Sequence, residues 1–243
     1  MNPVIELLKN HTSVRKFNEQ PVTKEEEQVI LECAMRGASA GNMMQYSIIC
    51  IRDKDTLTKL AESCDHQPFI ASAGLALLFL ADNNKWKNLF EIRNVTDNGN
   101  PYVGPQIPDL MLGIQDAMIA AQNSVIAAES LGLGTCYIGD IVERVEFHRE
   151  LFHLPPHTMP ATLVVMGHFD IKPKLRPRFD AQYVTFDEIY PIVDESFING
   201  MFRKEEEKQA DYAQAYYSRK LGSDFFKEMI RSTRVYLDQW LGE

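Results

Sequence analysis

The sequence of 243 residues has little cysteine and no closely spaced cysteine pair. The four cysteines are Cys33, Cys50, Cys64 and Cys136, each in an apolar or helical context, so we expect buried thiols. A disulfide framework or a zinc site would need closer, paired spacing. The number and spacing of the cysteines therefore favour neither a disulfide-stabilised protein nor a zinc-binding protein.

Positive charge is also scarce in this chain. Lys and Arg number 25 against 34 Asp and Glu, which gives a formal net charge of −9 and a pI near 5.2. A protein that binds nucleic acid mainly through its phosphates would carry a basic face. We therefore expect no nucleic-acid partner. Disorder is also disfavoured, because 45% of the residues are hydrophobic and 10% aromatic.

A long uninterrupted apolar run is missing as well. The most apolar helical segment contains a charge-free stretch of only 12 residues, 117–128, whereas a membrane-spanning helix needs about 20. The first residues carry no basic segment ahead of an apolar stretch, so we expect no signal peptide. These absences predict a cytoplasmic protein without a membrane partner.

The patterns that are present predict one α+β domain over residues 1–243, with a sheet and flanking helices. Thr23 and Glu26 have the spacing of a capping box at the start of a helix. Other helices are expected at 3–10, after a cap at Asp53 or Asp55, at 109–131 and at 143–151, and strands at 46–52, 74–82, 135–138 and 161–169. We expect an irregular excursion at 85–108 and a helical C-terminal arm at 203–243, split near Gly222.

The expected helix 109–131 is apolar on most of its circumference and rich in alanine. A helix of this kind lies either in the centre of a large domain or in an interface between subunits. Both alternatives are open from the sequence.

Several common catalytic motifs are absent or out of context. Gly132-Leu-Gly134 resembles the start of a dinucleotide-binding fingerprint, but it follows an expected helix and precedes a strand, the reverse of the required order. The chain contains no GxxxxGK[ST], and its GxSxG match at residues 37–41 (GASAG) follows an expected helix, so we expect no nucleophile elbow there. His148, His153 and His157 are interrupted by two prolines, so we expect surface or core histidines and no metal site.

Three segments nevertheless suit a ligand that combines an anion with a planar ring. Residues 11–17 (HTSVRKF) gather hydroxyls, an imidazole and two cations in a loop, and Arg matches phosphate with a planar fork. Residues 172–178 (KPKLRPR) are the one locally positive stretch of an acidic chain. Residues 132–139 (GLGTCYIG) flank a strand with glycines, which let backbone approach a ligand closely. Each segment alone is equally compatible with a solvated loop or a simple turn.

Taken together, these segments resemble the FMN-dependent nitroreductase and NAD(P)H:flavin oxidoreductase family, in its larger, NADPH-type, oxygen-insensitive subgroup. Residues 11–17 match the family's H-x-S-[IV]-R-x-F opening, and 175–178 (LRPR) match its L-K-P-R. Gln67 and residues 132–139 match a flavin-contacting glutamine and the glycine-led strand under the ring. Residues 38–42 fall at a serine-rich turn, of which only Ser39 is kept.

The resemblance implies a central mixed sheet flanked by helices, a helical C-terminal extension, and a homodimer with FMN at the subunit interface. It implies that FMN carries electrons from NAD(P)H to nitroaromatics, quinones or flavins in a ping-pong cycle, without a catalytic side chain. The residues it assigns to FMN are His11, Thr12, Ser13, Arg15, Ser39, Gln67, Tyr137, Ile138, Gly139, Arg176 and Arg178. Arg15 is the candidate for positive charge near the pyrimidine end of the ring, and Arg176 and Arg178 for the phosphate.

Two departures from the family pattern leave alternatives open. Asp140 stands where a second glycine often follows Gly139, which affects the backbone contact to the reactive flavin edge. Residues 216–221 (YYSRKL) resemble a Y-Y-x-x-R segment, with Lys220 at the place of its arginine, and make Arg219 and Lys220 candidates for NAD(P)H, but the basic loop that usually follows is short. A reductase of free flavin and a non-catalytic flavin-binding protein are therefore alternative functions.

Overall fold

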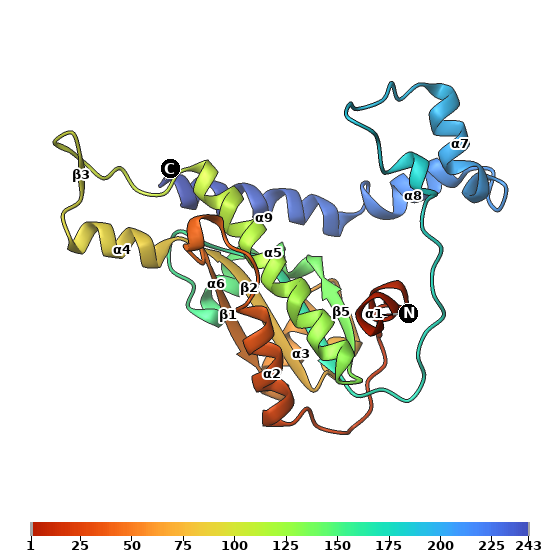
Figure 1. Cartoon of the computed structure of the whole chain (residues 1–243), viewed down its shortest axis with the longest axis horizontal. Helices are drawn as coiled ribbons and strands as arrows, with labels where there is room; N and C mark the ends of the chain where they lie inside the picture. The colour runs from red at the N-terminus through yellow and green to blue at the C-terminus, as the bar shows by residue number, and fades with distance from the viewer. Residues whose placement is uncertain (1, 243) are drawn as a thin grey trace. The chain divides into compact units, whose positions relative to one another are not determined.

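The computed structural model describes residues 2–242. They divide into two compact units, the first made of residues 2–174 and 228–242 and the second of residues 175–227. The sheet and its covering helices belong to the first unit, shown in Figure 1.

The first unit is built on a four-stranded sheet in the order β1-β2-β6-β5. The strands are β1 (Tyr46–Ile51), β2 (Leu75–Asp82), β5 (Gly134–Ile138) and β6 (Thr158–Gly167). Each of the three ladders is antiparallel, so the mixed sheet that we expected is not seen among the described strands. Every residue of β2 is buried, as its continuous apolar sequence predicts for a strand covered on both faces.

Two helices cover one face of the sheet. They are α2 (Lys24–Ala34) and the long α5 (Ile107–Ser130), which runs across the sheet in Figure 1. Ile30 of α2 and the small residues Ala117 and Ala121 of α5 are fully buried against Leu77 and Phe79 of β2. The predicted capping box of α2 is confirmed, because Thr23 and Glu26 exchange both bonds.

The other face carries α3 (Lys54–Ser63), the short turns η2 (Pro68–Ile70) and η3 (Gly139–Val142), and α6 (Val145–Phe152). Leu57, Leu60 and Ile70 pack there against Leu78 and Val165 of the sheet. Asp53 caps α3 by accepting a hydrogen bond from the backbone of Thr56 over 2.8 Å. This face positions the segment after β5.

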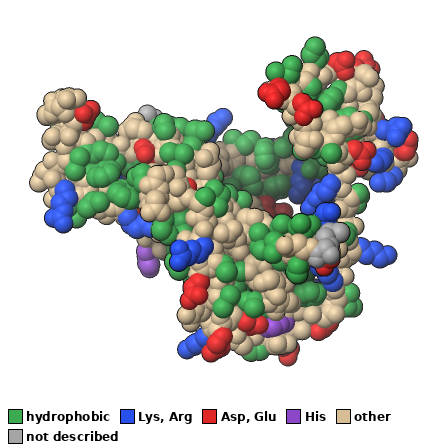
Figure 2. Space-filling view, in the orientation of Figure 1, with side chains coloured by type: hydrophobic (Ala, Val, Ile, Leu, Met, Phe, Trp, Pro, Cys, Tyr) green, Lys and Arg blue, Asp and Glu red, His purple; other side chains and the backbone are tan. Residues whose placement is uncertain are grey.

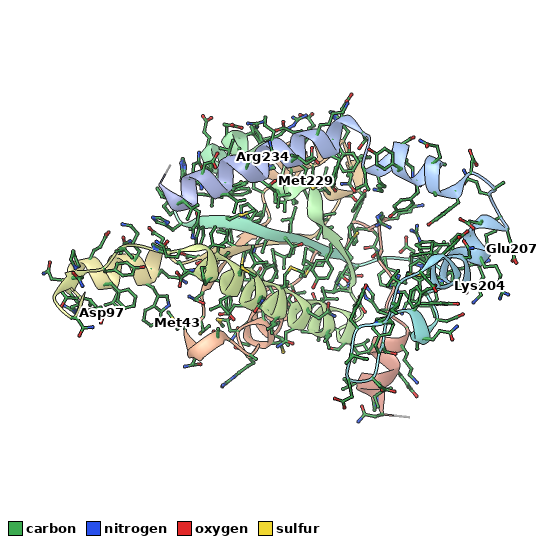
Figure 3. All side chains as sticks on the ribbon, turned by 90° about the horizontal axis from the view of Figure 1, so that it is seen from above. Met43, Asp97, Lys204, Glu207, Met229 and Arg234 are labelled. Carbon is green, nitrogen blue, oxygen red and sulfur yellow. The ribbon has the colours of Figure 1, made fainter. Side chains whose placement is uncertain are left out.

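The excursion at 85–108 is more regular than we expected. It contains α4 (Asn84–Ile92) and a small hairpin of β3 (Thr96–Asp97) and β4 (Asn100–Pro101), and Figure 3 shows Asp97 at its outer end. Phe90 packs on Trp86 and Tyr102, with ring centres 5.7 and 5.1 Å away. The polar sequence hid the helix because this aromatic packing, rather than an apolar face toward the sheet, holds it.

The end of the chain forms more helix than the predicted arm. The structure places α7 (Glu195–Glu206) and α8 (Tyr212–Lys220) in the second unit, and α9 (Asp224–Leu241) after a break at residues 221–223. The break near Gly222 agrees with the prediction, whereas α7 begins eight residues before 203. Tyr236 and Trp240 of α9 are buried in the first unit beside Leu110 and Met159.

The structure corrects the expectation of four buried thiols. All four cysteines are free, with Cys64 and Cys136 buried, Cys50 half-buried and Cys33 exposed on α2. Cys33 faces outward because Ile30 and Ala34 already occupy the buried face of that helix. Among residues 2–242, no helix is long and apolar enough to cross a membrane.

Candidate active site

The segment 11–17 is fixed to the free edge of β5. Val14 donates its backbone N–H to the carbonyl of Thr135 over 2.8 Å, and its side chain is buried. A Cβ atom at Gly134 would lie only 2.6 Å from the Cβ of Val14. Glycine is therefore required at the start of β5 so that the loop can approach the strand.

Glu129, at the end of α5, holds the beginning of this loop. Its Oε1 atom lies 2.7 Å from Nδ1 of His11 and accepts a hydrogen bond from the Thr135 hydroxyl over 2.8 Å. His11 is thus oriented by a carboxylate that is itself anchored on β5. Thr12 lines a small cavity of about 160 Å³ at the same edge, together with Lys172.

Arg15 and Ser13 lie on the other side of the buried Val14, against the thiol of Cys136. Burial raises the pKa of that thiol, while the Arg15 cation and the Ser13 hydroxyl lower it. The Arg15 guanidinium carbon lies 5.9 Å from the centre of the Phe69 ring. Among the described residues Arg15 forms no ion pair with a carboxylate, so its charge is available to a ligand.

Gln67, at the start of η2, is held by two acceptors. Its Nε2 donates to the carbonyl of Cys64 over 2.9 Å and to Oδ2 of Asp140 over 2.7 Å. Because both partners only accept, the amide nitrogen must face them, and the carbonyl oxygen is what Gln67 offers to a ligand. Gly139, which precedes Asp140, has open space at the position of a Cβ atom.

Tyr137 and Ile138 are the last residues of β5. Ile138 is buried in the core, while the Tyr137 hydroxyl donates to the side-chain carbonyl of Gln122 on α5 over 3.1 Å. Burial, and then the charge of Glu129, raises the pKa of Tyr137. Both side chains are occupied by the fold, so their backbone is the part that a ligand could reach.

Ser39 lies in a different part of the first unit. Its turn leads through η1 (Ala40–Asn42) into β1, the edge strand opposite to β5. The Ser39 hydroxyl donates to Asp116 of α5 over 2.8 Å and accepts from the backbone N–H of Met44 over 2.6 Å. The structure therefore does not bring Ser39 together with the segment 11–17.

The four remaining predicted residues belong to the second unit. Arg176, Arg178, Arg219 and Lys220 are all exposed, and none of them forms an ion pair within residues 2–242. The guanidinium of Arg219 lies over the Tyr216 ring at 5.5 Å, and the ammonium of Lys220 over the Phe225 ring at 5.4 Å. Their assignment to phosphate groups stays a prediction.

Two acidic residues of the site were missed. Asp116 is only 2% exposed and accepts hydrogen bonds from Ser39 and from the backbone of Ala40 and Gln45. Glu143 is 4% exposed, and its Oε1 has no hydrogen-bond partner among the described residues. The sequence could have identified Asp116, because it is a single acid within an apolar stretch of helix. A buried carboxylate there needs hydrogen-bond donors around it.

These residues fit a flavin mononucleotide better than a metal ion. The described part of the chain contains no group of three or more His, Cys, Asp or Glu side chains that could hold a metal. Instead, the β5 edge combines an unpaired guanidinium, an oriented amide and open backbone at Gly139. The guanidinium can stabilise negative charge on a reduced ring, and the amide and the open backbone can bond its polar edges.

Comparison with known proteins decides the family. The family model described as nitroreductase family matches residues 8–168, which include the whole β5 site and the turn at Ser39. This chain belongs to the nitroreductase family. The four strands of the sheet and the covering helices α2, α3, α5 and α6 lie within this span, so the match covers the fold as well as the motifs.

The chain is similar to several curated members of the nitroreductase family. It is 32% identical over 237 residues to the oxygen-insensitive NADPH nitroreductase of Salmonella typhimurium, covering 97% of this chain and 92% of that protein. It is 32% identical over 199 residues to the FMN reductase [NAD(P)H] of Bacillus subtilis, covering 80% and 77%. The structure of NfrA2 from B. megaterium matches with a TM-score of 0.83 and 28% identity, over 99% of this chain and 98% of that one. The expected nitroreductase fold is thereby confirmed.

Proposed function

We propose that this protein is an FMN-dependent oxidoreductase that passes electrons from NAD(P)H to small oxidised acceptors such as nitroaromatics, quinones or free flavin. The observation that carries the proposal is the β5 edge, where Arg15, Gln67 and Gly139 surround one side of a strand in a nitroreductase-family chain. Three relatives named FMN reductase, NADPH nitroreductase and NADPH-flavin oxidoreductase support it.

The phosphate and ribityl groups of FMN would be held by the loop 11–17. His11 is oriented by Glu129, and the hydroxyls of Thr12 and Ser13 stand beside it as donors. Arg176 and Arg178, which are exposed and form no ion pair among the described residues, are the candidates that the 175–178 motif supplies for the phosphate dianion. Charge-assisted hydrogen bonds of this kind each contribute about 1.5–3 kcal/mol.

The ring of FMN would lie over the end of β5. The Gln67 carbonyl can accept from the ring N–H, and the backbone of residues 137–139 can bond the opposite ring edge. Arg15 stands on the same side as Gln67 and supplies positive charge where the ring gains electrons on reduction. FMN itself supplies the hydride and electron chemistry, and the chain binds and orients it.

A second copy of the chain would complete the site. Ser39 lies at the opposite edge of the sheet from the loop 11–17. Ser39 and this loop of the same chain therefore cannot both contact one FMN molecule. The outward face of α5 carries the exposed residues Met111, Met118 and Ile119. No charged residue occurs between 110 and 115. In Figure 2, hydrophobic side chains lie beside uncharged polar side chains and backbone on the face that carries α5. We infer a homodimer in which this face is buried and Ser39 reaches the partner's FMN.

The reduced nicotinamide would be selected by the second unit. Arg219 and Lys220 are exposed cations on one end of α8, and each is steadied by an aromatic ring. They suit the 2′-phosphate of NADPH. The cofactor preference is tested by comparing kcat/KM for NADPH and NADH in Arg219→Ala and in the matched variant Lys208→Ala.

A flavin reductase is the second candidate, because one relative that covers 80% of this chain is an FMN reductase. Steady-state kinetics separates the two functions. With NADPH varied at several fixed acceptor concentrations, parallel double-reciprocal lines are expected for a ping-pong cycle. A higher kcat/KM for a nitroaromatic than for free FMN favours the nitroreductase, and the reverse favours the flavin reductase. Intersecting lines with every acceptor would contradict the shared-site mechanism.

A further inference from the structure

Two carboxyl groups stand at the ring end of the site, and one of them, Asp140, stands where the family pattern often has a glycine. Asp140 follows the open Gly139 and accepts from Gln67 over 2.7 Å. Glu143 is one turn further, and its backbone N–H donates to the Asp140 carbonyl over 3.0 Å. Asp140 is partly exposed, whereas Glu143 is buried.

Asp140 shares its surroundings with Arg15. Both charges act on the Cys136 thiol, where Arg15 lowers the pKa and Asp140 raises it. The cation and the carboxylate therefore flank the same point beside β5, and they oppose one another there. Arg15 and Asp140 do not form an ion pair with one another. The negative charge of Asp140 therefore reduces the electrostatic effect of Arg15 on a bound ring.

Glu143 lies behind Asp140 in a mostly acidic environment. Asp65 faces it from the turn after α3, Asp140 from η3 and Glu228 from α9, and Arg144 is the cation that opposes them. Glu228 is already paired with Arg231 over 2.8 Å. Burial and these neighbouring carboxylates raise the pKa of Glu143 to about 7. Its unpartnered Oε1 is consistent with a carboxyl that stays protonated below that pH.

The buried groups that touch this cluster do not add charge to it near neutral pH. Burial lowers the pKa of His148 to about 4 and raises that of Cys64 to about 12, so the imidazole is uncharged and the thiol protonated. Glu143 is consequently the buried group of this cluster that can change charge near neutral pH.

We propose that Asp140 and Glu143 form an acid pair that tunes the bound flavin, Asp140 by fixing the Gln67 amide and lowering the midpoint potential, and Glu143 by adding a second negative charge when it ionises. The proposal rests on the proposed function. A hydride from NAD(P)H delivers two electrons and one proton, so the ring gains one negative charge on reduction. A carboxylate beside the ring opposes that charge, and a buried one is poorly screened by solvent.

The test is the two-electron midpoint potential of FMN bound to the full-length protein, measured by spectroelectrochemistry at pH 6 and pH 8.5. For Asp140→Asn we expect the ratio of oxidised to reduced flavin, measured at the wild-type midpoint potential, to fall about tenfold. For a two-electron couple this corresponds to a midpoint potential that is higher by about 30 mV. Asp140→Gly, which restores the family residue, should shift the potential in the same direction. Glu143→Gln should raise the midpoint potential clearly at pH 8.5. At pH 6 it should change the ratio of oxidised to reduced flavin less than twofold.

Matched controls and contrary outcomes make this test decisive. Asp55→Asn and Glu62→Gln change exposed acids on α3 and should leave the potential unchanged at both pH values. The proposal is overturned if both Asp140 variants bind FMN but shift the ratio less than twofold, or if Glu143→Gln has the same effect at both pH values. A wild-type protein that binds no FMN would instead overturn the proposed function.

Discussion

The Ser39 hydroxyl donates to Oδ2 of Asp116 over 2.8 Å, across 77 positions of the chain. The same carboxylate accepts from the backbone N–H groups of Ala40, over 2.9 Å, and Gln45, over 3.1 Å. One buried acid on α5 therefore shapes the whole turn that precedes β1. The long helix has two roles, one in the core and one in placing Ser39.

Asp116→Ala should destabilise the protein by about 3 kcal/mol or more. The substitution leaves buried donors without their charged acceptor, and each such bond contributes about 1.5–3 kcal/mol. Urea unfolding followed by circular dichroism measures the loss. Ser39→Ala, which removes one donor only, should cost about 1 kcal/mol. Equal losses in the two variants would show that Asp116 does not organise the turn.

Arg15→Ala should weaken FMN binding by about 10- to 150-fold, because a charge-assisted hydrogen bond contributes about 1.5–3 kcal/mol. Arg178→Ala should weaken it to a similar degree if the second unit supplies the phosphate cations. Fluorescence titration of the apoprotein with FMN gives the Kd. Lys16→Ala and Lys174→Ala remove exposed neighbouring cations and serve as matched controls. Stoichiometric FMN in Arg15→Ala after dilution and gel filtration would refute the assignment.

Ile119→Glu should convert the proposed homodimer to a monomer and release FMN. The substitution places a charge in the exposed apolar face of α5, which a partner copy would have to desolvate. Light scattering after size-exclusion chromatography gives the mass of each form. Thr58→Glu introduces the same charge on the exposed face of α3 and should leave the dimer intact. A wild-type protein that is monomeric and still binds FMN would contradict the shared site.

His148 should make the protein sensitive to acid. It is fully buried with Nε2 2.8 Å from the Ser63 hydroxyl, and burial lowers its pKa from 6.5 to about 4. Because the folded pKa lies below the unfolded one, this contribution to stability is complete above pH 6.5. It is lost as the pH falls through 6.5 toward 4.

The size of that loss at pH 4.5 is about 2 kcal/mol relative to pH 7.5. Urea unfolding at the two pH values should show that His148→Gln, which can still bond Ser63, loses less stability on acidification than the wild type. The comparison between variants removes the contribution of the other acids. An identical pH dependence would mean that folding does not lower the pKa of the imidazole.

Much of the fold is predictable from local patterns. The capping box at Thr23 fixed the start of α2, and the apolar run 74–82 predicted a central strand, because both signals are read within a few residues. The strand β6 was expected only from residue 161, whereas it begins at Thr158. In the structure Pro160 pairs with Leu80 at a register shift, where a ladder tolerates a residue without an N–H.

The site is less predictable because it depends on contacts between distant segments. The motif 11–17 was found from its residues and Gln67 from the resemblance to the family, but nothing near Ser39 shows that its hydroxyl is bonded to α5. The same holds for Asp140, whose role follows from its contact with Gln67, 73 positions away. Burial and charge at Glu143 likewise arise from four elements that meet only in the folded chain.

The most direct test of the account is an anaerobic titration of the purified protein with NADPH. The protein should be yellow as isolated, contain one FMN per chain, and lose its visible flavin absorbance with one equivalent of NADPH. Addition of a nitroaromatic or a quinone should then restore the absorbance. A colourless protein that binds no FMN, or bound FMN that NADPH does not bleach, would contradict the assignment as an FMN-dependent oxidoreductase.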